Sequence, residues 1–593
     1  MSFTSDKPLI VQSDRTILLE VDNPAYTEAR DYLVRFAELV KSPEHVHTYR
    51  LSPLSLWNAA ASGLDAETVI RVLSEFSKYP LPGNVVADIR EYMGRYGKVK
   101  LVAEGGEMHL VAAEPAIALE ILNNKRVQQY IKGRVDDRTL LIDPWERGLV
   151  KQALIKIGYP VEDLAGYVPG APLKFNLRKL TLSGEPFNLR DYQREAAEIF
   201  YASGSSKGGS GVIVLPCGAG KTIVGLAVMA LTQCYTLILV TNVTAARQWL
   251  AEIRDKTDLP EDMVGEYTGE KKEIKPVTIA TYQIITHRRK KEEDYPHFRL
   301  FNQQDWGLII YDEVHLLPAP IFRITAELQA RRRLGLTATL VREDGREDDV
   351  FSLIGPKKYD IPWKQLEAQG WIAKATCYEV RLNLPPEDRL SYAVAGDREK
   401  HRVAATNPDK DAVVEAIVKA HRGEQVLVIG QYLEQLERLS KRLGAPLITG
   451  KTPNREREQL YQAFREGRLP CLVVSKVANF ALDLPEASVA IQVSGTFGSR
   501  QEEAQRLGRI LRPKKSGLPA SFYSLVTRDT VEQQYAMHRQ LFLTEQGYRY
   551  EIITPERLSV GGPKGAERLS AEGGSLGGKI ISLAEWKQRA GKK

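Results

Sequence analysis

The stretch Gly211-Val-Ile-Val-Leu-Pro-Cys-Gly-Ala-Gly-Lys-Thr222 decides the fold of this chain. It begins as an apolar run, passes through a glycine-containing loop and continues into a helical pattern. The glycines let successive N–H groups point at one anion, and the helix N-terminus adds partial positive charge. Lys221 can reach the β- and γ-phosphates of a nucleotide, and Thr222 offers a hydroxyl to Mg²⁺. The stretch predicts a phosphate-binding loop, although Leu215 replaces the usual first glycine; an ordinary glycine-rich turn is the alternative.

Short apolar runs alternate with helical patterns on both sides of this loop and again later in the chain. The predicted strands are 211–215, 236–240, 277–280, 307–311 and 333–336 in a first series, and those near 425–429, 471–475, 488–493 and 520–525 in a second. Such alternation predicts parallel sheets with helices on both faces. We therefore predict an α/β fold with two similar lobes in tandem and a cleft between them, preceded by accessory α/β domains.

The length of 593 residues predicts about three to four domains, together with linkers. A hairpin is expected around Gly105-Gly106, between the strand-like stretches 99–102 and 107–112. We divide the chain into an N-terminal accessory domain (1–125), a small domain (126–180), a first lobe (181–365), a linker (366–410), a second lobe (411–552) and a glycine-rich flexible tail (553–593).

Composition restricts the class of protein. A hydrophobic content of 43% with 26% charged residues is typical of a soluble globular protein, and no window approaches the roughly 18 apolar residues of a membrane span. The N-terminus resembles no secretion signal, and the four cysteines lack the spacing of a zinc site. We expect a cytoplasmic protein that does not bind membranes. The net charge of +7 is compatible with a polyanionic partner but does not require one.

A second decisive stretch is Leu308-Ile-Ile-Tyr-Asp-Glu-Val-His315. Its apolar half predicts a buried strand that delivers Asp312 and Glu313 to the carboxyl edge of the sheet, where ligands bind in open α/β folds. Asp312 would hold Mg²⁺ through water, while Glu313 would orient and deprotonate the attacking water. His315 could sense the γ-phosphate.

Three shorter motifs complete the predicted site. The strand ending in Thr337-Ala-Thr339 can present two hydroxyls between the carboxylates and the neighbouring lobe. Upstream, Arg190 and Gln193 precede the phosphate loop, where an arginine can stack on or support adenine and a glutamine can hydrogen-bond its edge. In the second lobe, a helix would place its polar residues on one face, from which two guanidinium groups could neutralise charge on the transferred phosphoryl group. These residues are Gln505, Arg509 and Arg512. A basic surface helix or a nucleic-acid contact is the alternative for that helix.

These motifs, in this order, resemble the superfamily 2 helicases, and several longer stretches resemble the XPB family of DNA repair helicases. The stretches are 335–344, 483–487, 505–512 and 522–526. The resemblance is dense from about 187 to 552 and weaker before that. It implies that the two tandem lobes are RecA-like. It also implies an ATP-dependent DNA helicase of 3′ to 5′ polarity that opens DNA in nucleotide excision repair, with ATP and Mg²⁺ as cofactors and DNA as partner. It also implies that residues 126–180 form a damage-recognition-like domain and that part of 384–406 is a thumb-like insertion.

Motifs and resemblance together assign the site residues. Those expected in catalysis are Lys221, Asp312, Glu313, Gln505, Arg509 and Arg512. Those expected to bind ATP are Arg190, Gln193, Cys217, Gly218, Ala219, Gly220, Lys221, Thr222 and Asp483, with Thr222 and Asp312 holding Mg²⁺. Those expected to couple hydrolysis to unwinding are His315, Thr337, Thr339, Arg342, Glu343 and Asp344. By the resemblance alone, the backbone of DNA would contact Thr241, Arg247, Gln248, Thr281, Tyr282 and Gln283.

One departure from the family limits this transfer. Where many members have Gly-Asp-Thr, this chain has Ala478-Asn479-Phe480, so no role in phosphate contact is assigned to Phe480. Two alternatives stay open, namely a translocase or ATP-gated clamp on duplex DNA, and a scaffold that recruits a nuclease. The chain has no nuclease-like cluster of carboxylates and lysine, so cutting would need a partner. Only the resemblance argues against an RNA helicase.

Overall fold

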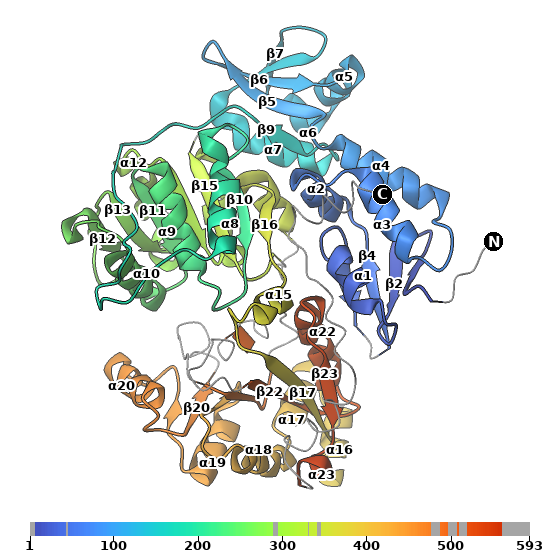
Figure 1. Cartoon of the computed structure of the whole chain (residues 1–593), viewed down its shortest axis with the longest axis vertical. Coiled ribbons are helices and arrows are strands. Elements are labelled where there is room, and N and C mark those ends of the chain that lie inside the picture. Colours follow the sequence, from blue (N-terminus) through green and yellow to red (C-terminus); the bar gives the residue numbers. More distant parts are fainter. Residues whose placement is uncertain are drawn as a thin grey trace.

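The computed structural model describes residues 6–42, 45–288, 295–329, 331–340, 346–475, 487–495, 507–508 and 519–559. The described residues form four sheets, one in each of four bodies (Figure 1). We call these bodies the N-terminal domain (6–96), the middle domain (97–166), lobe 1 (167–368) and lobe 2 (375–559), and we call residues 369–374 the connector. Within the described ranges, no helix combines the length and the apolar character needed to cross a bilayer.

The N-terminal domain is an antiparallel sheet of order β1-β2-β4-β3 with four helices packed against it. Its elements are β1 (Leu9–Val11), β2 (Thr16–Glu20), α1 (Tyr26–Leu33), β3 (Glu38–Lys41), β4 (Val46–Arg50), α2 (Pro53–Ala61), α3 (Ala66–Phe76) and α4 (Gly83–Arg95). In α3, for example, Asp65 accepts a hydrogen bond from Thr68 N at the N-terminus, and one apolar face is buried.

The middle domain corrects the boundary predicted at residues 125 and 126. Its elements are β5 (Val99–Glu104), β6 (Glu107–Ala112), α5 (Pro115–Asn123), α6 (Lys125–Gln128), β7 (Ile131–Arg134), β8 (Thr139–Ile142), α7 (Arg147–Lys156) and β9 (Val161–Asp163). The hairpin around Gly105-Gly106 is confirmed as β5 and β6. However, β6 pairs with β8 and β5 pairs with β9, so the predicted boundary falls inside one sheet of order β7-β8-β6-β5-β9. Pairing between strands distant in sequence leaves no local signal.

Lobe 1 confirms the parallel sheet and all five strands predicted for it, within two residues at each end. The sheet has the order β12-β13-β11-β14-β15-β10-β16 and is parallel throughout. Its strands are β10 (Ser210–Val214), β11 (Thr236–Val240), β12 (Val264–Tyr267), β13 (Val277–Thr281), β14 (Leu308–Asp312), β15 (Arg332–Thr337) and β16 (Lys357–Asp360). Its helices are α8 (Asp191–Tyr201), α9 (Lys221–Thr232), α10 (Val243–Lys256), α11 (Tyr282–Ile285), α12 (Leu300–Gln303), α13 (Ala319–Glu327), α14 (Glu347–Asp349) and α15 (Trp363–Ala368).

The central strands β10, β11, β13 and β14 are almost entirely buried, which is why they are nearly continuous apolar runs rather than alternating ones. The helix after the phosphate loop, α9, is buried on most sides. Gly225 within it packs directly against the ring of Trp249 from α10. This close packing fixes the start of α9 relative to the carboxyl edge of the sheet.

Lobe 2 repeats the parallel architecture with the order β19-β20-β18-β21-β22-β17-β23. Its strands are β17 (Ala375–Leu382), β18 (Val426–Gly430), β19 (Leu447–Ile448), β20 (Cys471–Ser475), β21 (Val489–Gln492), β22 (Ala520–Thr527) and β23 (Tyr550–Ile553). Its helices are α16 (Pro386–Val394), α17 (Asp397–Ala405), α18 (Asp409–Ala420), α19 (Leu433–Leu443), α20 (Asn454–Arg465), α22 (Val531–Glu545) and α23 (Pro555–Ser559).

The predicted linker 366–410 was wrong, because β17 within it pairs with β22 and β23 inside the sheet of lobe 2. Only the connector joins α15 to β17. The region predicted to be thumb-like forms α16 and α17, and its assignment as a thumb stays a prediction. Of the predicted tail, residues 553–559 complete lobe 2, and residues 560–593 lie outside the described ranges.

The N-terminal domain contacts both lobes and lies beside them in Figure 1. Toward lobe 1, Lys357 N donates to Asn58 Oδ1 at 2.9 Å, and the rings of Trp57 and Phe351 pack 6.4 Å apart. Toward lobe 2, Arg549 Nη2 donates to Val21 O at 3.0 Å, and Leu541 is buried in the core of the N-terminal domain. This accessory domain therefore bridges the two lobes.

Candidate active site

The phosphate-binding loop joins β10 to α9 at the carboxyl edge of the lobe 1 sheet. Leu215, where a glycine was expected, is fully buried, and its N–H donates to Thr337 O at 2.9 Å. It therefore extends the strand and needs no unusual backbone conformation. Gly220, in contrast, has a φ of 79°, and a Cβ added there would lie 2.5 Å from Gln193 Nε2. Both the conformation and the space at this position favour glycine.

The loop lysine and the paired carboxylates meet at this edge. Lys221 Nζ lies 3.4 Å from Glu313 Oε1 and 4.0 Å from Cys217 Sγ. Asp312 is fixed at the end of β14, because its Oδ2 accepts a hydrogen bond from Trp249 Nε1 at 2.9 Å. The structure thus brings together three residues predicted from two motifs about 90 residues apart in the sequence.

Charge interactions favour the charged forms of Lys221 and Glu313 despite their burial. Burial alone would lower the pKa of Lys221, but Cys217, Glu313 and Asp312 outweigh it and raise that pKa. Burial would raise the pKa of Glu313, but Lys221 and His315 lower it below its usual value. Burial and the adjacent Glu313 carboxylate raise the pKa of Asp312. The two neighbouring carboxyl groups therefore differ in proton affinity, as divided roles would require.

His315 connects the carboxylates to the Thr-Ala-Thr motif. Its Nδ1 lies 2.7 Å from Thr337 Oγ1 and 3.5 Å from Glu313 Oε2. The Thr337 hydroxyl in turn donates to Thr339 O at 2.6 Å. All three side chains are buried, so these three of the six predicted coupling residues form one hydrogen-bonded chain behind the site.

The motif before the loop supports the loop backbone. Gln193 Nε2 donates to Ala219 O at 3.0 Å, and Tyr192 OH donates to the same carbonyl at 2.6 Å. Arg190 Nη1 donates to Tyr192 OH at 3.0 Å, and its guanidinium lies over the ring of Trp371. Sequence reasoning found Arg190 and Gln193 but missed Tyr192 and Trp371. Tyr192 could have been noticed between the two motif residues, whereas no sequence signal points to Trp371.

The oxygen groups near the loop fit Mg²⁺. Glu313 Oε2 is buried and lies 3.5 Å from His315 Nδ1. The described part of the chain holds no cluster of three or more metal-ligating side chains. Mg²⁺ commonly binds through one or two carboxylates together with substrate phosphates and water, so the Asp312 carboxylate and the Thr222 hydroxyl match its requirements.

A glycine of lobe 2 lies against the phosphate-binding loop of lobe 1. The backbone of Gly508 lies directly against Cys217, because a Cβ added to Gly508 would collide with the Cβ of that residue. Gly508 belongs to the motif that carries the predicted arginines. The other predicted residues of lobe 2, together with the Arg-Glu-Asp motif of lobe 1, lie outside the described residues. They are Asp483, Gln505, Arg509, Arg512, Arg342, Glu343 and Asp344, and their roles stay predictions.

The residues predicted to contact DNA divide into exposed and buried groups. Exposed or half-exposed are Thr241, Arg247, Gln248 and Gln283. Arg247 pairs with Glu270 at 2.5 Å and lies 3.9 Å from Glu458 of α20 in lobe 2. Thr281 is buried and caps α11, while Tyr282 OH donates to Asp312 O at 2.8 Å. The hydroxyls of this buried pair are thus used inside lobe 1, and a contact between any of the six residues and DNA stays a prediction.

A two-lobed parallel α/β fold with a phosphate loop, paired carboxylates and a buried Thr-Ala-Thr motif defines a class, the nucleotide-hydrolysing motors of the helicase type. Comparisons with known proteins narrow this class. The family model of the ERCC3/RAD25/XPB C-terminal helicase matches residues 366–562, that of the type III restriction enzyme res subunit matches 186–342, and that of the helicase conserved C-terminal domain matches 9–136.

Relatives match over nearly the whole chain. A DNA 3′-5′ helicase XPB of Mycobacterium tuberculosis is 57% identical over 93% of this chain and 99% of its own length. One of Kineococcus radiotolerans is 56% identical over 94% and 98%. A general transcription and DNA repair factor IIH helicase/translocase subunit XPB of Antonospora locustae is 34% identical over 92% and 81%. The chain belongs to the XPB family of helicases.

Proposed function

We propose that this chain is an ATP-dependent DNA helicase of 3′ to 5′ polarity. The observation that carries the proposal is the approach of Lys221 Nζ to Glu313 Oε1 at 3.4 Å, which joins the phosphate loop to the paired carboxylates. The names of the bacterial relatives supply the substrate and the polarity. ATP is the expected nucleotide, and Mg²⁺ the expected metal.

In this proposal each residue of lobe 1 has one task. Lys221 exchanges its contact with Glu313 for the β- and γ-phosphates of ATP, which frees the Glu313 carboxylate to orient and deprotonate water. Thr222 and Asp312 would hold Mg²⁺, and the ion would supply positive charge against the phosphates. When Glu313 loses its contact with Lys221, His315 and Thr337 transmit this change toward the edge of lobe 1. Arg509 and Arg512 would complete the site when the lobes close.

DNA would lie along the exposed residues that follow β11 and β13. Arg247 and Gln248 on α10 and Gln283 on α11 are accessible, and side chains of these types commonly hold phosphates without reading sequence. Arg247 also approaches lobe 2, so its contact with Glu270 and Glu458 would compete with a DNA phosphate.

The biological setting that we propose is nucleotide excision repair, with a nuclease as partner. The Antonospora relative is named a subunit of a transcription and DNA repair factor, which supports this setting. Because that name also includes translocase, movement on duplex DNA without processive unwinding is the second candidate. A strand-displacement assay beside a triplex-displacement assay separates the two.

Replacing Lys221 tests the core of the proposal. Lys221→Ala should reduce DNA-stimulated ATP hydrolysis by at least about 100-fold, because it removes the buried cation that stabilises the transferred phosphoryl group. DNA binding, measured by fluorescence anisotropy with single-strand, duplex and bubble DNA, should stay within about twofold. Lys207→Ala, which changes an exposed lysine of the same lobe, should leave both activities unchanged. Full ATPase activity in Lys221→Ala would make the assignment of the site wrong.

A further inference from the structure

Trp371 of the connector forms an unexpected contact with the nucleotide motif. The guanidinium carbon of Arg190 lies 4.4 Å from the centroid of the Trp371 ring, well within the roughly 6 Å at which a cation and an aromatic face attract each other. The indole is 38% exposed, so it is not a core residue held by packing on all sides. Its backbone is nevertheless anchored, because Trp371 N donates to Leu366 O at 2.9 Å.

Arg190 is oriented toward the phosphate loop by its other contacts. Its Nη1 donates to Tyr192 OH, and that hydroxyl donates to Ala219 O in the loop. Its backbone N–H donates to Gln193 Oε1 at 3.0 Å, which ties it to the second residue of the motif. The guanidinium is therefore held at one edge by Tyr192 and over one face by Trp371.

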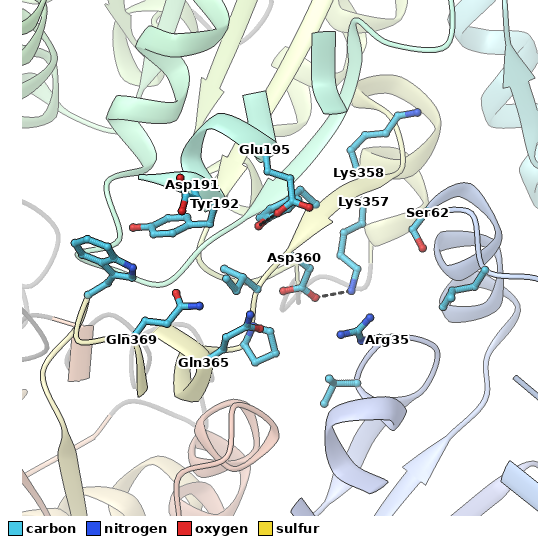
Figure 2. A pocket seen from close by; sticks show the side chains of 16 residues that line it. Arg35, Ser62, Asp191, Tyr192, Glu195, Lys357, Lys358, Asp360, Gln365 and Gln369 are labelled. Atoms are coloured by element: carbon cyan, nitrogen blue, oxygen red, sulfur yellow. Dashed lines mark hydrogen bonds and ion pairs between the residues drawn. The ribbon is translucent and has the colours of Figure 1, made fainter. Parts of the chain in front are cut away.

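Trp371 also lines a cavity of about 280 Å³, whose lining side chains are drawn in Figure 2. Its lining includes Asp191, Tyr192 and Glu195 from α8, Gln365 from α15, Gln369 from the connector, and Arg35 from the N-terminal domain. Trp371 and Tyr192 line this cavity, whereas Gln193, which faces the loop, does not. The cavity therefore borders α8 without reaching the phosphate-binding loop, and the indole of Trp371 has free volume beside it. The stack with Arg190, rather than close packing, fixes the position of the ring.

We propose that Trp371 is a positioning residue for the base of ATP. Its ring holds the Arg190 guanidinium flat, so that the opposite face of the guanidinium stacks on the adenine ring. This inference rests on the proposed function and adds to it a residue outside the helicase motifs. Because Trp371 belongs to the connector, a rotation of lobe 2 that displaces residue 371 also moves the ring that supports Arg190. Affinity for the base is therefore coupled to the angle between the lobes.

Nucleotide binding by variants of Trp371 tests this inference. Trp371→Ala should weaken binding of a ribose-labelled fluorescent ADP, and raise the KM for ATP, by roughly threefold to thirtyfold, the range that corresponds to one cation–π contact. The kcat with saturating ATP and DNA should stay within about twofold, because no reacting atom is touched. Trp371→Phe retains an aromatic face and should restore most of the affinity. Trp145→Ala, which removes another exposed indole, should change none of these values.

A ligand without a base separates positioning from general structural damage. Inorganic tripolyphosphate, which competes for the same loop, should bind Trp371→Ala and the unaltered protein equally. Loss of tripolyphosphate binding in Trp371→Ala, an unchanged affinity for ADP, a tighter affinity for ADP, or a Trp371→Phe variant as weak as Trp371→Ala would each overturn the inference. In a double-mutant cycle, Arg190→Lys with Trp371→Ala should be no weaker than Arg190→Lys alone.

Failure of this inference differs from failure of the proposed function. If Lys221→Ala binds tripolyphosphate as tightly as the unaltered protein, the phosphate site itself is misassigned. If Lys221→Ala loses that affinity while Trp371→Ala keeps full affinity for ADP, only the role of Trp371 is wrong.

Discussion

Lys221 and Glu313 form a largely buried ion pair, in which 12% and 21% of the two side chains are exposed. Each supplies the opposite charge that makes burial of the other tolerable, which is why the pKa values of the two groups move apart. A bound phosphate must therefore replace the Glu313 carboxylate as the partner of Lys221. The resting site holds the lysine in its charged form at the place where the nucleotide needs it.

Replacing Glu313 tests this exchange. Glu313→Gln should lower DNA-stimulated kcat by about 10²- to 10⁴-fold, because it removes the base that activates water. Binding of ADP should become tighter or stay unchanged, since Lys221 no longer has a competing carboxylate. Steady-state ATPase assays and calorimetric titration measure the two effects. Glu327→Gln, at an exposed position of the same lobe, is the control. Hydrolysis by Glu313→Gln within tenfold of the unaltered protein would contradict the assignment.

Among the elements, strand β4 carries a buried histidine at the contact between the N-terminal domain and lobe 2. His47 Nδ1 lies 3.2 Å from Tyr26 OH, and burial together with the nearby Arg549 and Arg30 lowers the pKa of His47 to about 4. An unfolded histidine titrates near pH 6.5. Between about pH 4 and 6.5 the unfolded chain thus binds more protons at this residue, so its contribution to stability is lost as the pH falls through that window.

His47→Gln should reduce this pH dependence. Hydrogen exchange of the β2 and β4 amides, which reports local unfolding free energies, should accelerate between about pH 6.5 and pH 5 in the unaltered protein beyond the intrinsic effect of pH. In His47→Gln that additional acceleration should be smaller. His45→Gln, which changes an exposed histidine paired with Asp22, should retain it. Equal acceleration in His47→Gln and in the unaltered protein would exclude His47 as the titrating group.

The elements also separate what the sequence could predict from what it could not. Strands such as β10 and β14 are recognisable in the sequence as apolar runs. The residues that follow parallel strands must meet at one edge of the sheet. The order of the motifs was therefore enough to predict the core of the site. Strands β12 and β16 lie at the edges of the sheet, and neither is a continuous apolar run: β12 is buried but contains Glu266, and β16 contains two lysines and Asp360. Strand β17 resembles part of a linker in the sequence, because its two partners, β22 and β23, follow about 145 and about 173 residues later.

Side-chain partners were the least predictable part of the site. Tyr282 was expected to face DNA, but its hydroxyl bonds to the Asp312 carbonyl 30 residues away. Trp249 and Trp371 contribute to the site from a helix and a connector without any motif. Tertiary contacts, which determine such partners, are not encoded in the spacing of neighbouring residues.

At the scale of the whole molecule, Gly508 lets lobe 2 approach the phosphate loop. Gly508→Val should push the lobes apart, because its Cβ would occupy the space of Cys217. We expect DNA-stimulated ATPase activity to fall at least about tenfold, while secondary structure measured by circular dichroism is retained. Gly396→Val is the control in the same lobe, since a Cβ there meets no neighbouring atom and its φ is −76°. Normal activity in Gly508→Val would show that this contact is not needed for hydrolysis.

The shortness of the connector has a consequence for movement. Six residues, 369 to 374, join α15 to β17, and a chain of that length reaches at most about 20 Å. Lobe 2 can change its angle to lobe 1, but it cannot travel away from it. Tethering of this kind gives an effective concentration on the order of millimolar, so meeting of the lobes is an intramolecular event that does not depend on protein concentration. The two lobes always stay close to each other. Nucleotide binding therefore needs to supply only the small difference in free energy between two orientations of lobe 2 relative to lobe 1.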